Sequence, residues 1–165
     1  RSDYHSGTTW APVGNTPVVR ATGARIRVNL ISAISAQGAL RFMVTDKRLT
    51  AAVFIEFLKR LLHGAKAPVF LILDGHPVHR SVKVRKFAAS TDGQLHLFFL
   101  PSYSPELNPD ELVWNHLKRH RVGKTAVTGL DDLKRKVIGF LRSLQKLPDV
   151  VRAFFQQQHV PYASA

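Results

Sequence analysis

The chain has 165 residues, 45% of them hydrophobic, which is enough to bury the core of one domain. It carries 24 Lys and Arg against 11 Asp and Glu, and this net charge of +13 favours nucleic acid as a partner, with an anionic membrane surface second. The absence of cysteine excludes disulfides and thiolate metal sites, and no apolar run is long enough to cross a membrane.

The amino-terminal part predicts a loop, a hairpin and a helix. Residues 1–24 are rich in Gly, Thr, Pro and Ser, which indicates a loop. Arg25 to Ile34 begins with alternating polar and apolar residues and predicts a strand, residues 35–38 predict a turn, and Ala39 to Val44 predict the returning strand. Thr50 then precedes a helix with one apolar face, which ends at Gly64.

The middle of the chain predicts two buried parallel strands. Val69–Leu73 and Leu95–Leu100 are short apolar runs, and the segment between them predicts a helix from about Val78 to Ala89. Two such runs joined by a crossover helix are typical of a sheet covered on both faces.

The carboxyl-terminal part predicts further helices. One is expected from Pro109 to about Arg121. Thr128–Asp131 resembles a capping box that introduces a long helix, which Pro148 ends, and a last short helix is expected through Phe155.

Two acids follow the predicted strands. Asp74 comes directly after the first strand, at the edge where open α/β sheets bind ligands. Asn108 predicts the N-cap of the next helix, which puts Glu111 near the same edge. Paired carboxylates there suit Mg²⁺, and two such ions about 4 Å apart stabilise the attacking and leaving oxygens of a phosphoryl displacement. The simpler alternatives are that Asp74 caps the following helix and that Glu111 is the partner of Asn108 in a capping arrangement.

Histidines and basic residues add candidates. His116 and His120 have helical spacing for a zinc pair, but the Glu of an H-E-x-x-H motif is absent, so a solvated basic helix face is preferred. The basic segments are either solvated helix surfaces or phosphate contacts. The candidate DNA-binding residues are Arg80, Lys83, Arg85, Lys86, Lys118, Arg119, Arg121 and Lys124.

Two motifs resemble those of a known family. The first is Leu73–His79, in which His79 follows Asp74 by five residues, and the second is Leu100–Trp114, which contains Y-S-P-x-L-N-P-x-E-x-x-W. With the 36 residues between Asp74 and Glu111 (75–110) and a similar segment at Thr9–Pro17, they resemble the DDE transposases of bacterial insertion sequences in the Tc/mariner superfamily. The resemblance covers nearly the whole chain.

The resemblance implies an α/β fold of the RNase H-like type, with a mixed sheet flanked by helices. It implies a catalytic domain over residues 1–125 and carboxyl-terminal helices over 126–165 packed on it. It also implies three acidic ligands for Mg²⁺, with Mn²⁺ as a substitute. Asp74 is the second and Glu111 the third, and His79 and Asn108 lie beside the ligands or the substrate.

The first acid of the family normally lies on a strand before the Trp10 segment. That strand is therefore expected upstream of Arg1, which leaves the hairpin and the strand at Val69 without a partner along their facing edges. For this reason the 165 residues alone are expected to be inactive and only marginally stable.

The function implied is cleavage of double-stranded DNA at transposon ends, followed by attack of the freed 3′-hydroxyl on target DNA. The complete enzyme is expected to be a homodimer in the bacterial cytoplasm, associated with the nucleoid and without a membrane partner. One alternative is a catalytically incomplete, DNA-binding transposase remnant. Another is an RNA-binding or ribosome-associated basic protein, in which Asp74 and Glu111 need not face each other.

Overall fold

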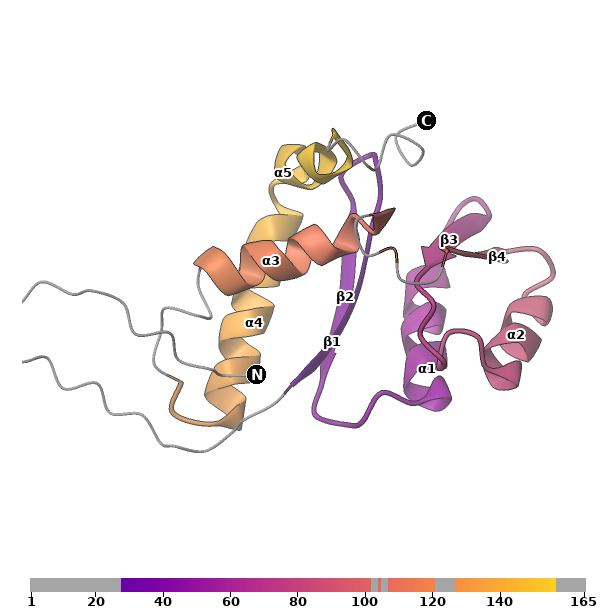
Figure 1. Ribbon diagram of the computed structural model, residues 1–165, viewed down its shortest axis with the longest axis horizontal. Coiled ribbons are helices and arrows are strands. Elements are labelled where there is room, and N and C mark those ends of the chain that lie inside the picture. The colour runs from indigo at the N-terminus through magenta and orange to yellow at the C-terminus, as the bar shows by residue number, and fades with distance from the viewer. Residues whose placement is uncertain (1–27, 102–103, 105–106, 121–126, 157–165) are drawn as a thin grey trace, which may run out of the picture.

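The structure, a computed structural model, describes residues 28–101, 104, 107–120 and 127–156 (Figure 1). The elements are β1 (Asn29–Ile34), β2 (Leu40–Thr45), α1 (Ala51–Leu62), β3 (Val69–Leu73), α2 (Val82–Ala89), β4 (Leu95–Phe99), α3 (Asp110–His120), α4 (Leu130–Gln145), α5 (Pro148–Ala153) and the 3₁₀ helix η3 (Phe154–Gln156). None of the described helices could span a membrane.

Strands β1 and β2 form the predicted hairpin, with Ile34 paired to Leu40 in an antiparallel register. Its turn is closed by the amide of Ser35, which donates to the carbonyl of Ala39 over 2.9 Å. Gly38 in this turn has a φ of +90°, and a Cβ at this position would lie 2.7 Å from the carbonyl oxygen of Pro148. The turn therefore needs glycine both for its backbone conformation and for its close approach to the start of α5.

Strands β3 and β4 form the predicted parallel pair, with Val69 opposite Leu95. Helices α1 and α2 pack on one face of this pair, and the Thr50 hydroxyl caps α1 by accepting from the amide of Val53 over 3.3 Å. On the other face the apolar side chains of Phe70 and Phe98 remain 64% and 51% exposed.

The four described strands form two separate two-stranded sheets. The hairpin stands between two hydrophobic cores (Figure 1). Leu30 and Leu40 belong to the first core, with α3, α4, α5 and η3, whereas Ile31 and Met43 belong to the second core, with α1, α2, β3 and β4. Alternate residues of each strand point to opposite faces, so one hairpin contributes to both cores.

Two predicted helix starts are wrong. Helix α2 begins at Val82 instead of Val78, because the Ser81 hydroxyl accepts from the amide of Val84 over 3.4 Å and so caps the helix there. The expected capping box at Thr128 does not form, since Gly129 is the N-cap of α4 and has no side-chain bond. The backbone amide of Thr128 instead donates to a carboxylate oxygen of Asp132 over 3.1 Å.

Several predicted element boundaries agree with the structure, and others lie outside the described residues. Helix α1 and strand β3 lie where the sequence predicts them, and β4 ends at Phe99, one residue before the predicted Leu100. Residues 25–27 of the first predicted strand and Arg121 at the end of the predicted α3 lie outside the described residues.

Candidate active site

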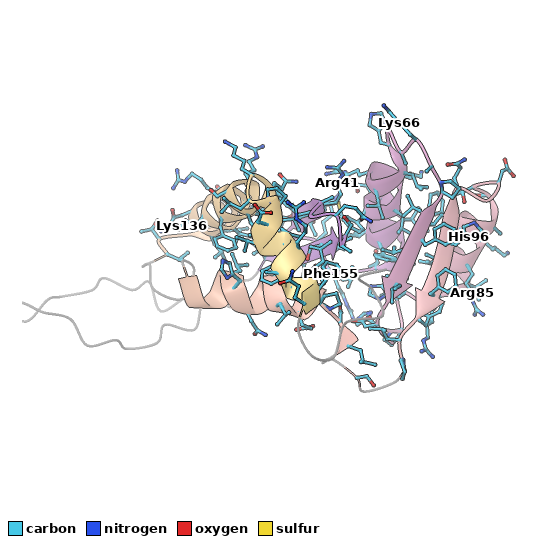
Figure 2. The ribbon with its side chains drawn as sticks, turned by 90° about the horizontal axis from the view of Figure 1, so that it is seen from above. Arg41, Lys66, Arg85, His96, Lys136 and Phe155 are labelled. Carbon is cyan, nitrogen blue, oxygen red and sulfur yellow. The ribbon has the colours of Figure 1, made fainter. Side chains whose placement is uncertain are left out.

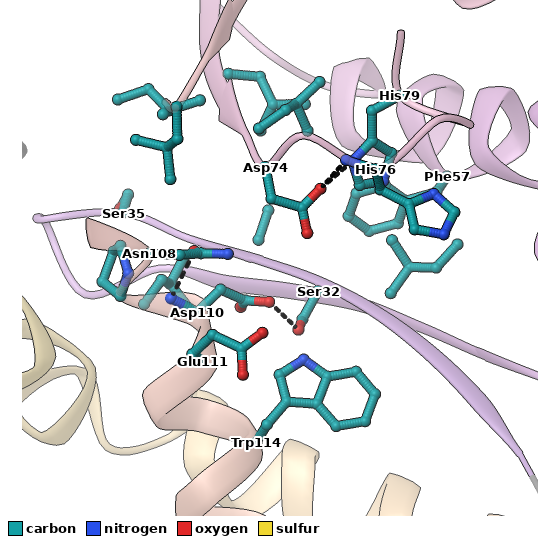
Figure 3. A pocket seen from close by; sticks show the side chains of 18 of the residues that line it. Ser32, Ser35, Phe57, Asp74, His76, His79, Asn108, Asp110, Glu111 and Trp114 are labelled. Carbon is teal, nitrogen blue, oxygen red and sulfur yellow. Dashed lines mark hydrogen bonds and ion pairs between the residues drawn. The ribbon is translucent and has the colours of Figure 1, made fainter. Parts of the chain in front are cut away.

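A cavity of about 720 Å³ lies between β1, β3 and the start of α3. Both predicted acids line it, Asp74 from the end of β3 and Glu111 from the first turn of α3 (Figure 3). Other polar side chains also line it, namely those of Ser32, Ser35, Gln37, His76, His79, Asn108 and Asp110. The structure therefore brings together residues from three segments that are far apart in the sequence.

Asp74 is held by the turn that follows β3. Its Oδ1 atom lies 2.7 Å from Nδ1 of His79 and accepts from the amide of His76 over 3.0 Å. The hydrogen bond from His79 lowers the pKa of the Asp74 carboxyl, although partial burial opposes this shift. Since Ser81 caps α2, the alternative in which Asp74 is the cap of that helix is wrong. The side chain remains 49% exposed, so a ligand can reach it.

His79 is itself fixed by packing. Its ring centroid lies 4.4 Å from that of Phe54 on α1, and its side chain is only 14% exposed. The imidazole therefore connects the core of the domain to Asp74 and restricts the directions in which that carboxylate can turn.

Asn108 and Glu111 form the start of α3. The Asn108 side-chain oxygen accepts from the amide of Asp110 over 3.1 Å, as expected for an N-cap residue. The Glu111 side chain is exposed, and its carboxylate makes no hydrogen bond or ion pair with another described residue. It does not take part in a capping box, and its charge stays available to the cavity.

Asp110 is a site residue that the sequence analysis missed. Its Oδ2 accepts from the Ser32 hydroxyl over 2.8 Å, and the Trp114 side chain also hydrogen-bonds this carboxylate. Its Oδ1 is buried and has no partner in the described structure. Burial, followed by repulsion from Glu111 and Asp74, raises the pKa of Asp110 to about 6.

The sequence did contain a signal for Asp110. It is the acid directly before Glu111, in a chain that has only 11 acids. An acid in the first turn of a helix is favoured by the helix dipole. Because the dipole already explains an acid at this position, the sequence alone does not point to a role in the cavity.

The donor atoms of this cavity fit a hard divalent cation. Mg²⁺ in proteins is held by one or two carboxylates together with phosphate oxygens and water, and Asp74 and Glu111 supply such carboxylates. Within the part of the chain that the structure describes, no three His, Cys, Asp or Glu side chains are already placed to hold one ion.

The predicted basic residues fall in different places. Arg80, Lys83, Arg85 and Lys86 are exposed on α2 and the turn before it, and the Arg80 guanidinium carbon lies 5.3 Å from the centre of the Phe99 ring. Lys118 and Arg119 are in α3, whereas Arg121 and Lys124 lie outside the described residues. Figure 2 places Arg85 on the side of β3 and β4, and Lys136 at the opposite end of the molecule.

His116 does not belong to a solvated basic face. Its ring centroid lies 5.7 Å from that of Phe140 and 5.9 Å from that of Phe154, and the residue is partly buried. The preferred interpretation of this histidine from sequence is therefore wrong, because α4 and η3 cover that side of α3.

Comparisons with known proteins identify a family from the sequence and a fold from the structure. The sequence profile of the DDE superfamily endonucleases matches residues 1–134. The catalytic domain of Mos1 mariner transposase is similar in structure, with a TM-score of 0.55, 11% identity, and coverage of 83% of this chain and 80% of that chain. The same Mos1 domain solved with Raltegravir and Mg gives a TM-score of 0.56, 11% identity, and coverage of 84% and 82%.

The Mos1 mariner paired end complex with Mn is similar as well, with a TM-score of 0.60, 12% identity, and coverage of 98% of this chain and 52% of that chain. No curated protein matches the chain. At these identities the structural likeness shows the fold, and it confirms the predicted RNase H-like class with a helical carboxyl-terminal part.

Proposed function

The chain belongs to the DDE superfamily of endonucleases, and on this basis we propose that it forms the catalytic part of an insertion-sequence transposase. The reaction is Mg²⁺-dependent cleavage of double-stranded DNA at transposon ends, followed by transfer of the cut strand to target DNA. The observation that carries the proposal is the presence of Asp74 and Glu111 in one cavity at the edge of β3.

In this proposal Asp74 and Glu111 hold the divalent cations. When bound, such ions activate water and stabilise the attacking and leaving oxygens of the phosphoryl transfer. His79 donates to Asp74 and so keeps this carboxylate ionised and oriented. Asn108 fixes the first turn of α3 and thereby the direction from which Glu111 enters the cavity.

The basic residues bind the DNA backbone. Arg80, Lys83, Arg85 and Lys86 are exposed beside the turn that holds Asp74, and the basic segment from Lys118 to Lys124 continues from the helix that holds Glu111. Contacts of these basic residues with phosphates hold the DNA at the domain that contains the two acids. Binding through phosphates is independent of sequence and weakens steeply with salt.

The proposal extends to assembly and location. The related Mos1 protein forms a paired end complex, and a homodimer of this chain in its complete enzyme is an assembly that holds two DNA ends together. The expected location is the bacterial cytoplasm, at the nucleoid, because the substrate is chromosomal DNA.

A second candidate is a DNA-binding remnant without catalysis. The observation that favours it is that, among the described residues, no three acids or histidines are placed to hold one ion. This candidate keeps the basic surface and lacks a complete metal site.

A nicking assay separates the two candidates. The complete natural protein is incubated with supercoiled plasmid carrying transposon ends, with Mg²⁺ or with EDTA, beside Asp74→Asn and Glu111→Gln. Nicking that requires Mg²⁺ and is lost in both variants, while DNA binding persists, supports the transposase. Salt-sensitive binding without nicking at any metal concentration refutes it and supports the remnant.

A further inference from the structure

Asp110 places a third carboxylate in the cavity of Asp74 and Glu111, and this inference rests on the function proposed above. Asp110 comes from the first turn of α3, and Figure 3 shows it between Ser32 of β1 and Glu111. The proposed mechanism uses the other two acids and leaves this one without a role.

The two oxygens of Asp110 have different surroundings. Oδ2 is anchored by the Ser32 hydroxyl at 2.8 Å, and the Trp114 side chain also hydrogen-bonds the carboxylate. Oδ1 is buried and, within the described structure, has no hydrogen-bond partner. Metal-ligating side chains commonly have this arrangement, in which neighbouring donors orient the group and an oxygen is left for the ion.

The charges around Asp110 favour a cation. No Lys or Arg side chain forms an ion pair with Asp110 or Glu111 in the part of the chain that is described, although the protein has a net charge of +13. A buried carboxylate oxygen without a donor is costly, and two neighbouring carboxylates add to this cost. A divalent cation bound by the three carboxylates compensates two of their three negative charges.

The three side chains are held to different degrees. Asp110 is held by its anchors and Asp74 by its bonds to His76 and His79, whereas the Glu111 carboxylate is exposed and has no bond to another described residue. The three carboxylates are not yet at ligand spacing, and rotation of the Glu111 side chain toward the other two brings a further ligand oxygen to the ion. We therefore infer that Asp110 is a third carboxylate ligand of the metal site, oriented by Ser32 and Trp114.

The test measures Mn²⁺ affinity from the electron paramagnetic resonance signal of free Mn²⁺, without DNA. The variants are Asp110→Asn, Ser32→Ala, Asp74→Asn and Glu111→Gln. Asp131→Asn is the matched control, because Asp131 is also an acid in the first turn of a helix but does not line the cavity. Asp110→Asn keeps an oxygen that can accept from Ser32, so it removes the charge and preserves the shape.

We expect Asp110→Asn to weaken Mn²⁺ binding at least about tenfold, Ser32→Ala to weaken it severalfold, and Asp131→Asn to leave it unchanged. Circular dichroism checks folding. If Asp110→Asn does not fold, the Ser32→Ala arm decides, and unchanged affinity in that variant overturns the inference.

The remaining arms separate this inference from the proposed function. Weaker binding in Asp74→Asn and Glu111→Gln together with normal binding in Asp110→Asn overturns the role of Asp110 alone. Normal binding in all of these variants overturns the proposed metal site as well.

Discussion

Replacing Asp110 with Asn should stabilise the protein at neutral pH. Burial and the two neighbouring carboxylates raise the pKa of Asp110 from its ordinary 3.8 to about 6. At about 1.36 kcal/mol for each pKa unit, the ionised side chain costs the folded state about 3 kcal/mol. The amide of Asn has no charge, so the variant avoids this cost and keeps an oxygen for the Ser32 hydroxyl.

The gain should depend on pH in a defined window. Below pH 3.8 both the folded and the unfolded chain hold the proton, and the two proteins should be equally stable. Between 3.8 and about 6 the unfolded wild type releases the proton while the folded form keeps it, so wild-type stability falls as the pH rises. Above a pH of about 6, the difference in stability between Asp110→Asn and the wild type reaches a plateau.

Urea denaturation followed by circular dichroism, at several pH values and with EDTA present, measures this difference. For a chain of this size, about 3 kcal/mol corresponds to a rise of roughly 6–12 °C in the melting temperature. A difference that does not change with pH, or a variant less stable than wild type at pH 7.5, would refute the reasoning from buried charge.

Three further outcomes follow from the site and the fold. The double variant Lys83→Gln, Arg85→Gln should lower the slope of log DNA affinity against log salt by about 1.8, and an unchanged slope would mean that α2 does not contact phosphates. His79→Ala should raise the pKa of Asp74 toward its ordinary value, seen by NMR titration, and reduce nicking roughly 10- to 100-fold. Gly38→Ala should destabilise the protein by about 1–3 kcal/mol in urea, and more than Gly93→Ala, because both have a positive φ but only Gly38 contacts Pro148. Equal losses of stability in the two variants would show that the contact with Pro148 is not the cause.

The elements that the sequence predicted well are those governed by local pattern. β3 and β4 are uninterrupted apolar runs, and α1 has a capping threonine followed by one apolar face. For α1 the local pattern and the packing agree. β3 and β4 form the predicted parallel pair, but the prediction that both of its faces are covered is wrong, because Phe70 and Phe98 are exposed on one face.

The predictions that failed depend on competition between neighbouring groups. At the start of α2, residues 76–80 form a turn bound to Asp74, and the helix begins only after its cap, Ser81. At Thr128 the side chain had the right chemistry for a cap, but the Asp132 carboxylate bonds its backbone amide. Asp110 was missed because its importance comes from Ser32, which lies 78 residues earlier and is brought to it only by the fold.

Because the hairpin lies between two cores, substitutions of its buried residues should affect the distance between the two acids. Asp74 is attached to the second core through β3 and Leu73, whereas Glu111 is attached to the first through α3 and Val113. The spacing of the two carboxylates is thus set by the thickness and tilt of the hairpin.

Buried substitutions such as Met43→Leu or Leu40→Met, which nearly conserve volume, should cost little stability. They can still move one acid relative to the other, and a displacement of about 1 Å in a catalytic group can lower a rate about a hundredfold. Residues that never touch DNA or metal would then determine how fast this protein cuts.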